Sequence, residues 1–219
     1  MPASKAEARL VAIEGVIGVG KTSLARLLAR GMGARLHLEV VDENPFLPRF
    51  YSEPKRYAFP TQIFFLLSRY RQQQEFFQTD LFEQRVVSDY LFAKDRIFAN
   101  VNLADDELRL YERLVVELEA RVPVPDRVVY LQASIETLLT RIARRGRSYE
   151  RDLPRSYLEN LADAYNHYFF HYREAPLLVV NTNDIDFVNN PRHFEDLRRR
   201  IQSSWSGVQY YTPAPEAGA

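Results

Sequence analysis

The chain of 219 residues contains no cysteine, and it has few glycines, eight in all, and four lysines. Without cysteine it can form neither a disulfide bond nor a thiolate metal site, which favours a reducing compartment. No apolar segment approaches the length needed to cross a bilayer, and the first residues, MPASKAEAR, lack the apolar core of a signal peptide. We therefore expect a cytoplasmic protein.

An excess of charge of one sign is also missing. The 29 basic and 29 acidic side chains give a formal net charge of +0. A dedicated nucleic-acid-binding protein normally carries a basic surplus. We therefore expect small molecules as partners, and neither nucleic acid nor a membrane.

Apolar segments and helical patterns alternate along the chain. Strands are predicted over residues 9–15, 35–45 (running into a loop), 84–89, 127–132 and 176–182. Helices are predicted over 21–33, 57–79, 104–121, 134–144 and 154–173. The strands do not alternate apolar with polar residues, which is typical of parallel strands covered on both faces. The sequence predicts an α/β fold with a five-stranded parallel sheet flanked by helices, in one domain over 1–205, and a flexible tail over 206–219.

The scarce glycines and lysines gather in one stretch, IEGVIGVGKTSL, at residues 13–24. It contains the pattern G-x-x-x-x-G-K-T between a predicted strand and a predicted helix, which disfavours an incidental glycine-rich turn. Glycines allow backbone amides to converge on phosphate oxygens, Lys21 can reach the β- and γ-phosphates, and the Thr22 hydroxyl can bind Mg²⁺. The stretch predicts an ATP site formed by Gly15, Gly18, Val19, Gly20, Lys21, Thr22 and Ser23.

A carboxylate follows another predicted strand, at the end of RVVSD. Asp89 can supply an oxygen ligand to Mg²⁺ beside Thr22, because carboxylates suit this hard cation. The N-K-x-D motif that reads guanine in small GTPases is absent from the chain. This absence disfavours a GTP-dependent switch protein and favours a protein that holds a small polar acceptor.

Five segments in order resemble the deoxynucleoside kinases: the phosphate-binding loop, VVDENPFL, FYSEPKRYAFPTQIFFLLSRYR, SDYLFAKDRIFA and RIARRGRSYE. The resemblance extends from about residue 9 to 185. It implies a P-loop kinase fold with an arginine-rich lid, and a homodimer whose surface the segments 57–79 and 104–121 can supply. Bacterial enzymes acting on purine deoxynucleosides are the most similar members.

The resemblance also implies roles for individual residues. Glu43, just past the second predicted strand, is expected to accept the proton of the acceptor 5′-hydroxyl; its alternative role is helix capping. The sugar 3′-hydroxyl is expected to contact Tyr51 and Glu150. The nucleobase is expected to contact Gln62, Arg69, Asp95 and Phe98. The moving phosphoryl group is expected to contact Arg141, Arg145 and Arg147. For Arg69 and the lid arginines, the alternative is an exposed helix charge.

The chain departs from the family pattern after Asp89. The family usually has an arginine at the next position, whereas this chain has Tyr90, and Lys94 one turn later is a candidate to supply the missing charge.

Taken together, these features predict an enzyme that transfers phosphate from ATP, with Mg²⁺, to the 5′-hydroxyl of a purine deoxynucleoside. Two alternatives remain. A nucleoside-monophosphate kinase of the thymidylate-kinase kind would need further cations for the acceptor phosphate, for which Arg49, Lys55 and Arg56 are candidates. A regulatory protein that binds ATP without transferring phosphate would not need the carboxylate.

Overall fold

The computed structural model of the protein describes residues 8–78, 85–151 and 153–211. Within them, six parallel strands form one sheet in the order β2-β3-β1-β4-β5-β6. The strands are β1 (Leu10–Gly15), β2 (Arg35–His37), β3 (Val86–Ser88), β4 (Arg127–Gln132), β5 (Leu177–Asn181) and β6 (Val208–Tyr211). The α/β class and the parallel sheet are therefore confirmed, with six strands in place of five.

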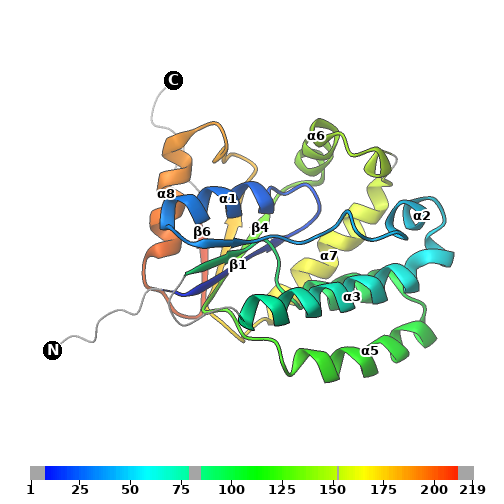
Figure 1. Cartoon of the computed structure of the whole chain (residues 1–219). Coiled ribbons are helices and arrows are strands. Elements are labelled where there is room, and N and C mark those ends of the chain that lie inside the picture. Colours follow the sequence, from blue (N-terminus) through cyan, green and yellow to red (C-terminus); the bar gives the residue numbers. More distant parts are fainter. Residues whose placement is uncertain (1–7, 79–84, 152, 212–219) are drawn as a thin grey trace.

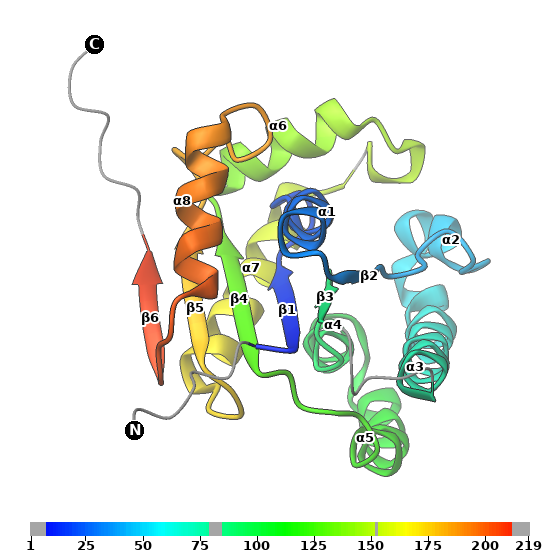
Figure 2. The same cartoon turned by 60° about the vertical axis from the view of Figure 1, so that its left-hand side comes forward.

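Helices cover both faces of the sheet. The α-helices of the described residues are α1 (Lys21–Met32), α2 (Leu47–Ser52), α3 (Pro54–Gln78), α4 (Lys94–Asn102), α5 (Asp105–Glu119), α6 (Ile135–Arg145), α7 (Arg155–His171) and α8 (Pro191–Gln202). Helices α1 and α8 pack together on one face, and α4 and α7 on the other (Figures 1 and 2). Helices α2, α3 and α5 form a further layer beside β2 and α4 (Figure 2).

The core has two parts. The larger part surrounds the central strands, where five of the six residues of β1 and of β4 are buried, as expected for strands covered on both faces. The smaller part joins α2, α3, α4 and α5 around Leu66, Tyr111 and Val115. The outer helical layer therefore has its own apolar support, and it can form one wall of a cavity beside the sheet.

The described C-terminal segment contradicts one prediction. Val208–Tyr211 forms β6, which pairs in parallel with β5, so these residues are not part of a flexible tail. Strand β6 lies at the edge of the sheet and is only partly buried, and for this reason its sequence lacks the apolar run of β4 or β5. The rest of the predicted tail, from residue 212, lies outside the described residues.

Helices α2, α4 and α8 were not predicted, and β2 ends at His37 rather than continuing toward residue 45. Among the helices that the structure describes, none combines the length and the apolar character needed to cross a bilayer.

Candidate active site

A cavity of about 910 Å³ opens where the strands end at their carboxyl termini. Its walls are the glycine-rich loop after β1, the segment after β2, helix α3, the segment joining α6 to α7, and the loop at 183–189 after β5. Carboxyl ends of parallel strands are the usual place for ligand sites in open α/β sheets. The volume lies within the range of small-molecule sites.

The glycine-rich loop forms the floor of this cavity on the α1 side. Six of its seven predicted residues, from Gly18 to Ser23, line the cavity, whereas Gly15 closes β1 behind them. Gly20 precedes α1 with φ of 108°, a left-handed conformation that side chains with a Cβ rarely adopt. The Lys21 ammonium donates to the carbonyl oxygens of Gly15 (2.6 Å) and Val16 (3.2 Å).

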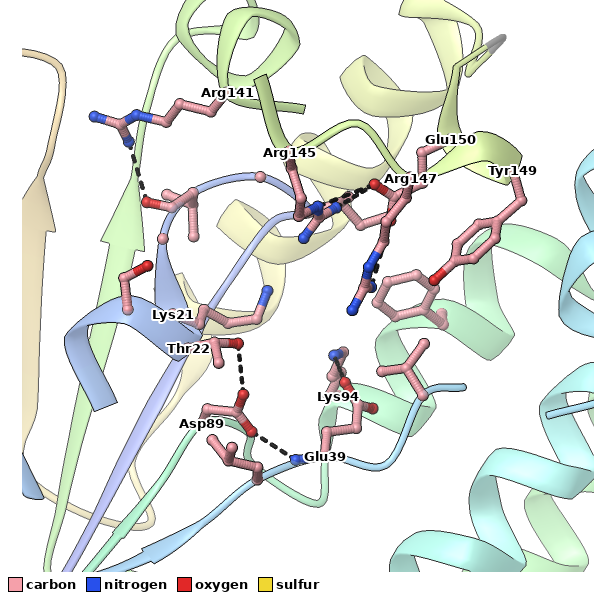
Figure 3. Close-up of a pocket in the computed structure, with 18 of the residues that line it drawn as sticks. Lys21, Thr22, Glu39, Asp89, Lys94, Arg141, Arg145, Arg147, Tyr149 and Glu150 are labelled. Atoms are coloured by element: carbon pink, nitrogen blue, oxygen red, sulfur yellow. Dashed lines mark hydrogen bonds and ion pairs between the residues drawn. The ribbon is translucent and has the colours of Figure 1, made fainter. Parts of the chain in front are cut away.

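A hydroxyl and a carboxylate meet beside the loop. Thr22 Oγ1 donates a hydrogen bond of 2.7 Å to Asp89 Oδ2, and the Glu39 amide donates one of 2.7 Å to Asp89 Oδ1 (Figure 3). Burial raises the pKa of the Asp89 carboxyl, while these two bonds act against the shift. These two hard oxygen donors on the cavity floor have the chemistry to hold a Mg²⁺ ion, and the metal site stays a prediction.

Three charged side chains form a nearly buried cluster deeper in the cavity. Glu39 Oε1 accepts from the Arg69 guanidinium (2.9 Å from Nε and 2.6 Å from Nη2), and Glu39 Oε2 accepts from the Lys94 ammonium. Burial opposes ionisation of Glu39, but Lys94 and then Arg69 outweigh it and hold the pKa of this carboxyl far below its usual range. Glu39 is therefore a carboxylate at any physiological pH.

The position of Glu39 corrects the assignment of Glu43. Glu43 is exposed and does not line the cavity, because its neighbour Asn44 turns inward and bonds the Thr61 carbonyl at 3.1 Å. The expectation of a carboxylate just past the second strand was sound, but β2 ends at His37, so that position belongs to Glu39. The signal lay in the sequence RLHLEVVDEN, and the end of the strand was misplaced.

Helix α3 presents Gln62 and Arg69 to the cavity from one face, as their spacing of seven predicted. Phe98 of α4 lines the same region. Asp95 does not: it is fully buried behind the wall, where it accepts from Arg69 and from the Tyr111 hydroxyl (2.8 Å). Its backbone carbonyl accepts from Gln62 Nε2 at 2.8 Å. Asp95 thus orients Arg69 and Gln62 rather than facing a ligand.

Tyr51 and Glu150 both line the cavity, which brings together the pair expected at the sugar. Burial, followed by the neighbouring Tyr157 and Glu150, raises the pKa of Tyr51 well above its ordinary value, so its hydroxyl stays protonated. Tyr149, which was not predicted, stacks on Tyr51 with ring centroids 5.7 Å apart.

The three lid arginines behave differently from one another. Arg145 and Arg147 point into the cavity above Lys21 and Lys94, and both face Glu150 (Figure 3). Arg141 also lines the cavity, but its guanidinium points away from Lys21 and donates to the Val19 carbonyl (3.1 Å; Figure 3) and to the hydroxyl (2.9 Å) and carbonyl (2.7 Å) of Thr182. Arg141 therefore joins α6 to the glycine-rich loop and to the end of β5.

One further feature lay beyond the sequence reasoning. The loop at 183–189 lines the cavity beside the glycine-rich loop, and it carries no recognisable local motif. Tyr90 does not take the place of a charged group, since its hydroxyl faces away from this cavity and lies 2.8 Å from His37 Nε2. Lys94 is the cation that the segment after β3 brings to the cavity.

The candidates for binding an acceptor phosphate, Arg49, Lys55 and Arg56, are exposed and lie outside the cavity lining. Their positions give no support to a monophosphate acceptor.

Comparison with known proteins shows the family of the chain. The family model described as deoxynucleoside kinase matches residues 11–205. The chain belongs to the deoxynucleoside kinase family. It is accordingly a phosphotransferase, and the resemblance seen in its motifs is confirmed.

Relatives and solved structures cover nearly the whole chain. A deoxyguanosine kinase of Bacillus subtilis is 36% identical over 202 residues, which span 89% of this chain and 97% of that protein. A deoxyadenosine/deoxycytidine kinase of the same organism is 31% identical over 89% of this chain and 92% of that protein. The structure of a deoxyadenosine kinase from M. mycoides with bound dATP has a TM-score of 0.77 at 25% identity, covering 89% and 100% of the two chains.

Proposed function

We propose that this deoxynucleoside kinase transfers the γ-phosphoryl group of ATP to the 5′-hydroxyl of a purine deoxynucleoside. The observation that carries the proposal is that Glu39, Lys21 and the Thr22–Asp89 pair line one cavity large enough for both substrates. A phosphate-binding loop with an ionised carboxylate beside it is what in-line transfer to an alcohol needs.

In this reaction the acceptor oxygen forms a bond to the γ-phosphorus, and the bond from that phosphorus to the bridging oxygen of ADP breaks. The hydroxyl proton passes to Glu39. Arg145 and Arg147 are placed to face the charge that develops on the phosphoryl oxygens. When bound, Mg²⁺ would neutralise phosphate charge, and Thr22 and Asp89 are the side chains to hold it.

The acceptor nucleoside is assigned to the part of the cavity between α3, α4 and Tyr51. Arg69 and Gln62 are the polar groups that face this region, Phe98 gives an aromatic wall, and Tyr51 with Glu150 suits a sugar hydroxyl. The relatives named deoxyguanosine and deoxyadenosine kinase support a purine base.

A panel of acceptors tests this function. We expect the purified chain, given ATP and Mg²⁺, to phosphorylate deoxyguanosine or deoxyadenosine with a higher kcat/KM than deoxycytidine or thymidine. Strict preference for a pyrimidine would overturn the purine assignment. Faster turnover of deoxynucleoside monophosphates would favour the monophosphate-kinase alternative, and ATP binding without transfer to any acceptor would favour the regulatory one.

We also propose that the protein is a homodimer formed through α3 and α5. Leu67 of α3 and Leu110 and Leu114 of α5 are 50%, 49% and 42% exposed, which is unusual for leucines that face water. The two leucines of α5 are four residues apart and therefore share one face of the helix.

A further inference from the structure

Both oxygens of the Glu39 carboxylate are occupied in the protein without substrates. Arg69 binds Oε1 through two nitrogen atoms, and Lys94 binds Oε2. The side chains of Glu39, Arg69 and Lys94 are 9%, 4% and 9% exposed, so water replaces neither contact readily. Each cation lowers the basicity of the oxygen that it binds, so a hydroxyl passes its proton to Glu39 more readily once one of the two cations has left.

The two cations differ in how firmly they are held. Arg69 is fixed from its other side by Asp95, which the Tyr111 hydroxyl in turn holds. For Lys94, Glu39 is the one ion-pair partner within the described residues. An ammonium on a four-carbon stem reorients more easily than a planar guanidinium bound at several atoms. Lys94 is therefore the cation that can leave.

The space into which Lys94 can move lies toward Lys21. Both ammonium groups line the same cavity, and Figure 3 shows Lys94 on the side of the floor opposite the Thr22–Asp89 pair. They are close enough that, after burial, the charge of Lys94 contributes most to lowering the pKa of Lys21, to about 8. Two positive charges that repel one another across a cavity are stabilised by an anion placed between them.

We propose that Lys94 is an exchangeable counter-ion of Glu39. Without a nucleoside it covers Oε2, and when a nucleoside binds it moves from Oε2 to the phosphoryl group that is being transferred. This exchange makes phosphoryl transfer depend on the presence of a nucleoside acceptor. While Lys94 binds Oε2, Glu39 is a weak base toward a water molecule beside bound ATP.

This inference rests on the proposed kinase reaction and adds a step that restricts it to nucleosides. If water reacted instead, its oxygen would bond to the γ-phosphorus, the bond to the ADP oxygen would break, and its proton would pass to Glu39, giving ADP and inorganic phosphate. Removing the ammonium should make this side reaction easier, although it removes charge that assists the transfer to a nucleoside.

The test compares wild type with Lys94→Met, which keeps the length without the charge, and Lys94→Arg, which keeps the charge. Two rates are measured for each: phosphorylation of the preferred deoxynucleoside, and release of phosphate from ATP without nucleoside. For Lys94→Met we expect nucleoside phosphorylation to fall about tenfold or more while phosphate release from ATP rises. Lys94→Arg should restore part of the wild-type ratio of nucleoside phosphorylation to phosphate release. Adding Glu39→Gln to Lys94→Met should abolish the phosphate release.

The outcomes separate this inference from the proposed function. Equal loss of both rates in Lys94→Met, with ATP binding and thermal midpoint unchanged, would mean that Lys94 contributes charge but does not control the acceptor. If wild type phosphorylates no nucleoside, the proposed function fails first. Should Lys94→Met not fold, a wild-type crystal structure with a deoxynucleoside and a non-hydrolysable ATP analogue decides. Lys94 Nζ within hydrogen-bonding distance of Glu39 would overturn the inference.

Discussion

At the scale of single residues, the cluster around Glu39 shows how a buried carboxylate stays ionised. Taking a carboxylate out of water is costly unless cations and hydrogen bonds replace the water. Here Arg69 and Lys94 bind its two oxygens, and Asp95 balances part of the charge of Arg69. The arrangement keeps the proposed base ionised without exposing it to bulk solvent.

Replacing Glu39 by glutamine should lower kcat by about 10²-fold or more, because the amide keeps the shape but does not accept the proton. ATP affinity should change little, since the phosphate-binding loop is intact. Because cations keep the pKa of Glu39 far below its usual range, its protonation should not limit the rate at about pH 5 and above. Steady-state kinetics and ATP titration of the variant measure these effects.

Glu43→Gln is the matched control. Glu43 is exposed and outside the cavity, so this variant should retain wild-type kcat and KM. Loss of activity in Glu43→Gln with normal activity in Glu39→Gln would restore the original assignment of the base to Glu43.

At the scale of elements, the arginines of α6 and of the segment after it have two different positions: Arg145 and Arg147 point into the cavity (Figure 3), and Arg141 bonds neighbouring backbone. The Ser134 hydroxyl caps the start of α6 by accepting from the Thr137 amide at 3.2 Å, and Gly146, with φ of 71°, caps its end. Gly146 is in the left-handed region, which lets the chain turn sharply and place Arg147 over the cavity. Arg141, one turn before Arg145, instead bonds the glycine-rich loop.

We expect Arg141→Gln and Arg145→Gln to differ in kind. Loss of the Arg141 guanidinium leaves the Val19 and Thr182 carbonyls without a donor, which should cost about 1–3 kcal/mol and lower the thermal midpoint by several degrees. Loss of Arg145 should lower kcat by about 10²-fold with a smaller change in the midpoint, since Glu150 retains Arg147 nearby.

Thermal denaturation and kinetics of the two variants provide the comparison. If Arg141→Gln leaves the midpoint unchanged and lowers kcat as much as Arg145→Gln, then Arg141 acts on the phosphoryl group as the sequence suggested.

At the scale of the whole molecule, the parallel sheet explains why residues far apart in sequence share one cavity. Strands β1, β2, β3 and β5 all run in the same direction, so the segments that follow them meet at one edge. Helices α2 and α3 line the cavity on the side that we assign to the acceptor, and α3 and α5, which lie side by side in the outer layer (Figure 2), carry the exposed leucines.

Replacing Leu114 by glutamate should dissociate the proposed dimer, because a charge in an apolar interface loses its hydration without gaining a partner. Sedimentation would then report the chain mass of 25.6 kDa, against twice that mass for wild type. Tyr210→Glu on β6, where the side chain is 74% exposed, is the control and should leave the dimer intact. A wild-type protein that sediments as a monomer at micromolar concentrations would contradict the proposal.

The sequence by itself determined the phosphate-binding loop, four of the helices closely, and the apolar strands β1, β4 and β5. These depend on local chemistry: backbone freedom at glycine, the helical period, and runs of buried apolar residues. The family followed from the order of five short segments, and the faces of Gln62 and Arg69 followed from their spacing of seven.

Only the tertiary structure decided which carboxylate enters the cavity, where Arg141 points, that Asp95 is buried, and that the chain after residue 207 completes the sheet. Pairing with β3 ends β2 at His37, and pairing with β5 makes β6 a strand. Asp95 and Arg141 bond partners that are distant in sequence. The ends of strands and the directions of these side chains depend on partners that are distant in sequence. A local sequence pattern carries no information on which of those partners is bonded.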